Sequence, residues 1–208
     1  MTRRTVALQH FKRVDPHFYT ATLAYHKSIP PELPCKTSRP KLFEELCGIV
    51  VSQQLATKAA DSIYKRVKAA CGQRLTPTSV LKTSDLKLRA AGLSGSKMKT
   101  LKAIASACRD GSLDLLTLRK LPEAEAGQKL QEIWGLGPWS TEMFLIFALG
   151  REDVFSVGDL GLIRAMETLY DLPKDTSHKK ALALAEKWAP FRTFASLLLW
   201  RLRDGTSR

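Results

Sequence analysis

The stretch IWGLGPWSTE, residues 133–142, decides the fold. Its glycines, Gly135 and Gly137, lie two positions apart and predict a tight turn. Residues 122–134 before the turn begin with proline and acidic side chains, which suit the first turn of a helix. Residues 138–150 begin with proline, end with glycine and are apolar nearly all round, as in a deeply buried helix. The stretch therefore predicts two helices joined by a hairpin turn.

Helical patterns also surround the hairpin. Apolar faces and helix-starting residues mark the segments 15–29, 41–54, 55–70, 77–82, 84–91, 96–111, 159–172, 177–188 and 190–205. The first of them starts with Asp15, a suitable helix cap, followed by proline. Residues before it are interpreted as a basic arm, and residues 29–40 as a proline-rich connector. No convincing run of strands is found, so an all-α fold is expected.

Charge is the unusual part of the composition. The 208 residues include 33 Lys+Arg and 20 Asp+Glu, a formal net charge of +13. A folded protein this basic usually meets a polyanion, because lysine and arginine release counterions from phosphates. A basic surface that only confers solubility is the alternative.

Cysteine spacing and the length of the apolar stretches indicate which metal sites and which cellular locations to expect. The four cysteines are too widely spread for a zinc or iron–sulfur site. The N-terminus has no apolar run suited to a signal peptide, and the apolar stretch at 144–149 is too short to span a bilayer. We therefore expect an intracellular protein without membrane contact.

Two predicted helix starts suit a DNA phosphate. The N–H groups that begin the second hairpin helix point out of the turn, and the helix dipole there favours an anion. We expect Leu136 to point inward and fix this turn. The candidate phosphate contacts of the hairpin are Gly135, Gly137, Trp139, Ser140 and Thr141. Those of the stretch LSGSKMKT are Ser94, Gly95, Ser96 and Lys97. The alternatives are an ordinary helix connection and a capped surface helix.

A lone carboxylate, Asp159, follows Gly158 at the start of an apolar helix. Aspartate is among the best N-caps, so capping alone explains the residue. A capping carboxylate can also point into a cleft, and the sequence leaves both roles open.

Four stretches give the chain a family resemblance. They are GIVVSQQLATKAA (48–60), GLSGSKMKTLKAIA (92–105), the hairpin through GDLGLIRA (130–165) and WAPFRTFASLLLWRL (188–202). In this order they resemble the helix–hairpin–helix DNA glycosylases, most closely the alkylation-repair branch of 3-methyladenine DNA glycosylases, type II. The resemblance implies one glycosylase domain over 1–208, made of two helical lobes with the active-site cleft between them. The implied lobes are 1–38 plus 152–208, and 39–151, which carries the hairpin 122–150.

The resemblance also implies site residues. Asp159 matches the family's catalytic aspartate, which would stabilise an oxocarbenium-like sugar and orient or deprotonate water. The implied base pocket consists of Trp139, Trp200, Met143, Phe18 and Tyr25. Electron-rich rings there would select a cationic base, although core packing explains any single tryptophan equally well. The implied DNA wedge is Gln53, Gln54 or Leu55, with Gln54 as first choice; a polar helix junction is the alternative.

The activity implied is that of a monofunctional glycosylase. It would flip alkylated purines such as 3-methyladenine and 7-methylguanine out of double-stranded DNA and hydrolyse the N-glycosidic bond, leaving an abasic site for base excision repair. Bifunctional relatives have a lysine where this chain has Trp139, so no lyase activity is expected. The alternatives are a glycosylase for deaminated or oxidised bases and a non-catalytic DNA-damage-binding module.

Partners and cofactors follow from the same resemblance. No cofactor, catalytic metal or iron–sulfur cluster is implied. The backbone carbonyls of Gln131, Ile133 and Leu136 are a candidate site for one sodium or potassium ion. A monomer is expected, in the cytoplasm or nucleoid of a bacterium or in the nucleus of a eukaryote.

Overall fold

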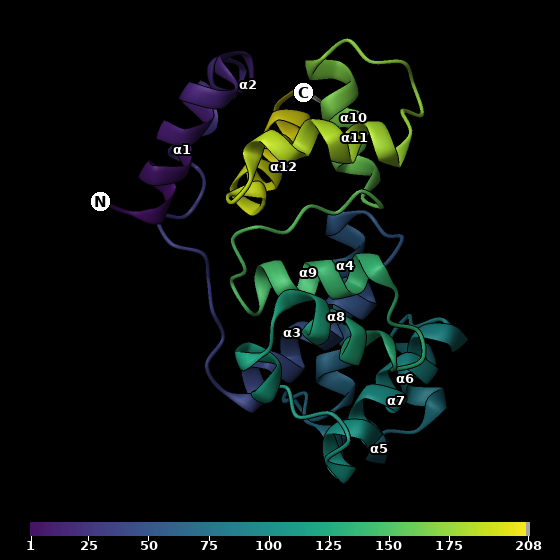
Figure 1. Cartoon of the computed structure of the whole chain (residues 1–208). Coiled ribbons are helices and arrows are strands. Elements are labelled where there is room, and N and C mark those ends of the chain that lie inside the picture. The colour runs from purple at the N-terminus through teal and green to yellow at the C-terminus, as the bar shows by residue number, and fades with distance from the viewer. Residues whose placement is uncertain (207–208) are drawn as a thin grey trace. The chain divides into compact units, whose positions relative to one another are not determined.

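The computed structural model describes residues 1–206, and every regular element within them is a helix (Figure 1). The prediction of an all-α fold is therefore confirmed. The chain divides into two compact units. We call Met1–Pro34 together with Gly150–Arg208 the terminal unit, and Cys35–Leu149 the central unit. None of the described helices has the length and apolar character needed to cross a membrane.

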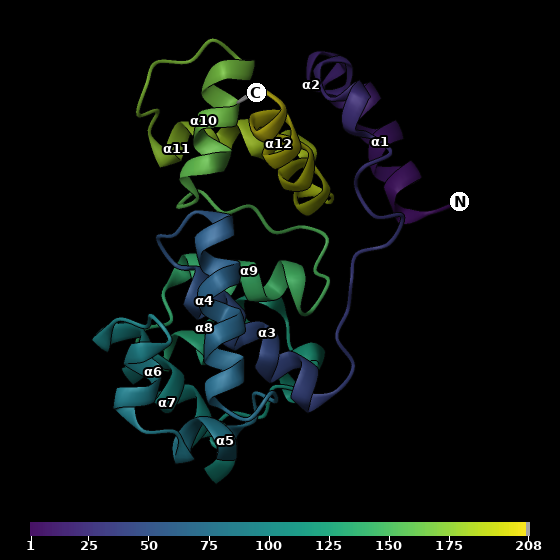
Figure 2. The same ribbon diagram turned by 180° about the vertical axis from the view of Figure 1, so that it is seen from behind.

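The central unit is built around α3 (Arg39–Ser52), whose apolar side chains are buried along its length. This helix contacts α4 (Thr57–Ala70), α7 (Gly95–Asp110) and α9 (Pro138–Phe147), which Figures 1 and 2 show from opposite sides. The other elements are α5 (Pro77–Lys82), α6 (Asp85–Ala90), the 3₁₀ helix η2 (Thr117–Lys120) and α8 (Glu123–Gln131). The helices α8 and α9 contact each other and form the predicted hairpin.

The terminal unit joins segments from both ends of the chain. Its elements are α1 (Arg3–Val14), α2 (Pro16–Ala21), the 3₁₀ helix η1 (Leu23–Tyr25), α10 (Leu160–Leu169), α11 (His178–Ala185), the 3₁₀ helix η3 (Glu186–Trp188) and α12 (Arg192–Thr206). Its core contains Phe11, Phe18 and Trp188, all with no exposed surface. The ring centroids of Phe18 and Trp188 lie 4.8 Å apart. Burial of these large rings holds the N-terminal helices to the C-terminal ones.

The helix α1 corrects the interpretation of the first residues as a basic arm. Thr2 caps this helix, because its hydroxyl accepts the N–H of Thr5 at 3.3 Å. Ala7 and Phe11 lie four residues apart on the same face and are fully buried. Basic residues stand near both ends of this segment, so its short apolar face is easily missed. The predicted helix 15–29 is also too long: α2 ends at Ala21 and the 3₁₀ helix η1 follows.

A buried carboxylate links four parts of the terminal unit. Asp15 is 4% exposed and caps α2 by accepting the N–H of Phe18 at 3.1 Å. The same carboxylate accepts bonds from the Trp188 indole at 3.0 Å and from the Lys187 ammonium at 2.7 Å. The hydroxyl of Tyr170 is its fourth donor. Because all four donors face one carboxylate, the cost of burying its charge is offset by hydrogen bonds.

Candidate functional site

The hairpin turn depends on Gly135. Its φ is +85°, in the left-handed region that favours glycine. A Cβ there would lie 2.0 Å from the hydroxyl oxygen of Thr100 on α7, so the turn lies directly on that helix. Leu136 is 4% exposed, which confirms that it points inward. The buried Leu136 and the close contact with Thr100 together fix the turn.

Gly137 has a different reason to be glycine. It is extended, with φ −93° and ψ −177°, and it is the N-cap residue of α9. A Cβ there would meet no described atom within 4 Å, so the space in front of this helix start is open. The side chains of Ser140 and Thr141 are buried, at 2% and 3% exposure. The backbone N–H groups of the first turn, rather than these hydroxyls, are thus the groups that suit an anion.

The turn after α3 carries the predicted wedge residues. Gln53 donates its side-chain amide to the carbonyl of Gly135 at 3.2 Å and to the Ser140 hydroxyl at 2.7 Å. Gln54 follows with φ +54°, and it is exposed, as is Leu55 at 38%. The structure thus directs Gln53 toward the hairpin, while Gln54 and Leu55 project from the surface of the central unit.

The start of α7 contacts the turn after α3. Ser94 caps this helix by accepting the N–H of Lys97 at 3.3 Å, and Ser94, Gly95 and Ser96 are all exposed. The Lys97 ammonium, however, donates to the carbonyls of Val51 and Gln53, each at 2.8 Å. Partial burial lowers the pKa of this ammonium. Its charge is thus directed at the end of α3.

The terminal unit holds the predicted catalytic carboxylate. Oδ1 of Asp159 accepts the N–H of Leu162 at 3.0 Å, which confirms that this residue caps α10. The indole N–H of Trp200 donates to the same oxygen at 3.1 Å. Both Asp159 and Trp200 are partly exposed. The carboxylate thus combines a fixed orientation with access to solvent.

A second charged group near this carboxylate was not predicted. A Cβ built on Gly161 would lie 2.0 Å from Nη1 of Arg203 and 3.0 Å from Oδ1 of Asp159. The Arg203 guanidinium therefore rests on the glycine backbone beside the carboxylate, and also bonds Asp204 at 2.6 Å. The glycine in the first turn of a helix was the sequence signal that could have indicated this close approach.

The other predicted pocket residues differ in exposure. Phe18 is fully buried in the core of the terminal unit, where it packs on Phe11 and Trp188. Tyr25 is half-buried, and a Cβ on Gly205 would lie 1.9 Å from its hydroxyl. In the central unit, Met143 is 4% exposed and Trp139 is half-buried in the first turn of α9. Trp139 and Trp200 are thus the partly exposed indoles among the predicted pocket residues.

The predicted cation site consists of backbone oxygens at the end of α8 and in the hairpin turn. The Ile133 carbonyl accepts the N–H of Leu136 at 3.1 Å, which uses one of its two lone pairs. Carbonyl oxygens are hard donors and suit a small cation. The carbonyl oxygens of this turn are therefore of a kind that a sodium or potassium ion can accept as ligands.

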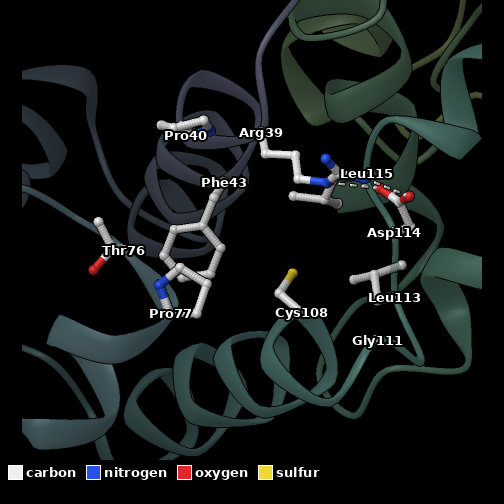
Figure 3. A pocket seen from close by; sticks show the side chains of 10 residues that line it. All are labelled: Arg39, Pro40, Phe43, Thr76, Pro77, Cys108, Gly111, Leu113, Asp114 and Leu115. Atoms are coloured by element: carbon white, nitrogen blue, oxygen red, sulfur yellow. Dashed lines mark hydrogen bonds and ion pairs between the residues drawn. The ribbon is translucent and has the colours of Figure 1, made fainter.

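The central unit also contains a cavity of about 360 Å³, and none of the predicted site residues lines it (Figure 3). It lies between α3, the start of α5 and the end of α7, and it is lined by Arg39, Pro40, Phe43, Thr76, Pro77, Cys108, Gly111, Leu113, Asp114 and Leu115. Burial, with smaller contributions from Asp110 and Asp114, raises the pKa of the Cys108 thiol to about 11. Such a thiol stays protonated near neutral pH and is a poor nucleophile. Cys108 is therefore not a candidate nucleophile in this cavity.

Comparison with known proteins agrees with the sequence patterns. The family model described as HhH-GPD superfamily base excision DNA repair protein matches residues 47–191. The DNA-3-methyladenine glycosylase 1 of Schizosaccharomyces pombe is 38% identical over 162 residues, which cover 76% of this chain and 71% of the relative.

Two solved structures extend this similarity over nearly the whole chain. The Schizosaccharomyces pombe 3-methyladenine DNA glycosylase in complex with abasic DNA has a TM-score of 0.84 and 33% identity, covering 94% of this chain and 95% of that one. The DNA-3-methyladenine glycosidase of Bacillus halodurans has a TM-score of 0.78 and 32% identity, covering 100% and 93%. These similarities confirm the resemblance that the four sequence stretches predicted.

Proposed function

The chain belongs to the HhH-GPD superfamily of base excision DNA repair proteins, and on that premise we propose that it is a monofunctional DNA-3-methyladenine glycosylase. It acts on double-stranded DNA that contains alkylated purines. It hydrolyses the bond between the damaged base and its deoxyribose and leaves an abasic site. The observation that carries the proposal is the partly exposed carboxylate of Asp159, held by the Trp200 indole.

DNA binding uses the central unit. The first turn of α9 offers backbone N–H groups and the positive end of a helix dipole to one phosphate. The net charge of +13 adds a sequence-independent attraction to the DNA backbone. Extruding a nucleotide from the stack costs a few kcal/mol. We assign Gln54 or Leu55, both exposed beside the hairpin, to the gap that the nucleotide leaves.

Base selection uses the indoles. Alkylation at N3 or N7 gives a purine a positive charge, and an electron-rich ring attracts a cation by about 1–2 kcal/mol when water is excluded. Trp200 and Trp139 are the partly exposed tryptophans among the predicted pocket residues, and we assign them to this recognition. A positively charged base is also a good leaving group, so the chemistry needs no strong general acid.

Bond cleavage uses Asp159. As the glycosidic bond breaks, its electron pair leaves with the base, which becomes neutral, and positive charge develops on the sugar. The carboxylate stabilises that charge, and water adds its oxygen to C1′ and gives its proton to the carboxylate. Trp200 and the N–H of Leu162 keep the Oδ1 atom of this carboxylate oriented during the step.

The proposed activity includes no strand cleavage and requires no cofactor. Trp139 stands where a lyase needs a lysine, and an indole forms no imine with the abasic sugar. Borohydride should therefore trap no covalent protein–DNA complex. We assign the hairpin carbonyls of Gln131, Ile133 and Leu136 a structural role toward one sodium or potassium ion. The substrate requires the protein to work where the cell keeps its DNA, in a nucleoid or a nucleus.

The test is release of free base from DNA methylated by dimethyl sulfate, with wild type compared with Asp159→Asn. Asparagine caps a helix as well as aspartate does but carries no charge, so folding should persist. We expect wild type to release 3-methyladenine and the variant to do so about 100-fold or more slowly, the usual effect of removing one electrostatic group.

Three outcomes would count against parts of the proposal. Wild type that binds abasic DNA but releases no base would be a binding module. Wild type that acts on hypoxanthine or 8-oxoguanine instead would have another substrate. An Asp159→Asn variant as fast as wild type would refute the catalytic role of the carboxylate.

A further inference from the structure

One lysine and one glutamine connect three segments of the central unit. Lys97 lies in the first turn of α7 and donates to carbonyls at the end of α3. Gln53, directly after α3, donates its amide to the hairpin. We propose that Lys97 and Gln53 are positioning residues that hold the turn of residues 53–55 against the hairpin. The inference rests on the proposed function, since it concerns how the glycosylase presents its wedge to DNA.

The lysine acts on the end of a helix. The last carbonyls of an α-helix have no partners within the helix, and the negative end of the dipole there attracts a cation. The Lys97 ammonium satisfies the carbonyls of Val51 and Gln53, both at 2.8 Å, with charge-assisted hydrogen bonds. Two of its three N–H groups are thereby used inside the protein. This use argues against Lys97 as a phosphate contact.

The glutamine continues the connection from α3 to the hairpin. Its backbone carbonyl accepts from Lys97, while its side chain reaches the Gly135 carbonyl and the buried Ser140 hydroxyl. Gln53 is therefore fixed at both ends, once by α7 and once by the hairpin. A movement of the hairpin turn would move the wedge turn with it.

The next residue shows why this turn needs support. Gln54 has φ +54°, a backbone conformation that costs energy for any residue other than glycine. Such a conformation persists only where the surrounding contacts impose it. The bonds of Lys97 and Gln53 supply those contacts immediately before it, and the N–H of Leu55 closes the turn on the Ser52 carbonyl at 3.1 Å. The exposed Gln54 and Leu55 are consequently presented in one orientation before DNA is bound.

The first test separates positioning from phosphate contact. The affinity of Lys97→Met for a duplex with an abasic-site analogue is measured over a series of salt concentrations. Loss of one phosphate contact reduces the slope of log affinity against log salt by about 0.9. We expect Lys97→Met to keep the wild-type slope. The matched control is Lys82→Met, which removes an exposed lysine at the end of α5 and should release base at the wild-type rate.

The second test measures the turn itself. Hydrogen exchange of the amides of residues 52–56, without DNA, should be about ten-fold or more faster in Lys97→Met than in wild type. Single-turnover base release should fall about ten-fold. Gln53→Met, which keeps the length of the side chain but removes the amide, should give the same two changes. The double variant should be no slower than the worse single variant, because both residues support one turn.

The outcomes distinguish this inference from the proposed function. Wild type that releases no methylated base would refute the function, while the exchange rates of residues 52–56 would still report on the turn. A salt slope reduced by about one in Lys97→Met would make the lysine a phosphate contact and overturn the inference. Unchanged exchange in both variants would overturn it as well. If Lys97→Met does not fold, the exchange of residues 52–56 in Gln53→Met still tests the inference, since this variant removes the bonds to the hairpin and leaves those of Lys97 in place.

Discussion

The indole N–H of Trp200, on α12, donates to the same oxygen of Asp159 that caps α10, at 3.1 Å. One carboxylate oxygen thus receives donors from two helices that pack against each other in the terminal unit. Its orientation depends on the packing of α10 on α12 and not on the flexible side chain alone. The carboxylate that we propose as catalytic is thus oriented by two packed helices while it stays partly exposed.

Trp200→Phe should separate this support from aromatic recognition. Phenylalanine keeps a ring but removes the N–H donor to Asp159. Hydrogen bonds to charged groups are worth about 1.5–3 kcal/mol, so we expect kcat for methylated DNA to fall about ten-fold or more. Affinity for a duplex with an abasic-site analogue, which contains no base to stack, should change less than two-fold. A large loss of that affinity with an unchanged kcat would show that the indole serves DNA binding alone.

The two hairpin glycines should respond differently to alanine. Gly135→Ala adds a methyl group 2.0 Å from the Thr100 hydroxyl at φ +85°. We expect a loss of at least about 2 kcal/mol of stability, from the clash and from the left-handed backbone. For a chain of this size the melting temperature should fall by about 5 °C or more.

Gly137→Ala should leave the fold intact. This residue is extended, and its Cβ would meet no described atom within 4 Å. The added methyl group instead fills the space through which a phosphate reaches the first turn of α9. We expect weaker DNA binding with a melting temperature within about 4 °C of wild type, because alanine is a worse N-cap than glycine by only about 1 kcal/mol. Equal DNA affinities for Gly137→Ala and wild type would contradict a phosphate site at this helix start.

The Asp15 carboxylate should make the terminal unit sensitive to acid. Burial, the largest influence, raises its pKa, but donors from Lys187, Tyr170, Phe18 and Trp188 together lower the pKa below the ordinary value of 3.8. A lowered pKa in the folded state means that the stabilisation is present above the unfolded value and is lost as pH falls through the folded value. We expect Asp15→Asn to cost about 1.5–3 kcal/mol at pH 7, since the buried Trp188 indole and the partly exposed Lys187 ammonium lose a charged acceptor.

Urea unfolding of the wild type and Asp15→Asn at two pH values would check this prediction. At pH 7 the two proteins should differ by the full cost of the lost ion pair. Well below pH 3.8 the wild-type carboxylate also gains a proton, so the difference should shrink. A difference that is the same at both pH values would show that shape and packing, rather than charge, make Asp15 necessary.

The sequence predicted the hairpin and the capping aspartate because both depend on local chemistry. Glycine, proline and aspartate restrict the backbone by themselves, so Gly135 and Asp159 could be recognised without any tertiary contact. The helix α1 was missed because its stability comes from Phe11 in a core that the other end of the chain provides. Lys97 was predicted as a phosphate contact from its place at a helix start, and Arg203 was not predicted at all. The carbonyls that Lys97 binds and the glycine that Arg203 approaches are distant in sequence and carry no pattern of their own.

The two units are built from different parts of the chain, and this affects the order in which a growing chain can fold. The central unit is one continuous segment, whereas the terminal unit needs its first 34 residues and its last elements together. On the ribosome, α1 and α2 therefore emerge early but must wait for Trp188 and α12 before Phe11 and Phe18 can be buried. A ribosome-bound chain that ends within α11 should contain a protease-resistant central unit and a cleavable N-terminal segment.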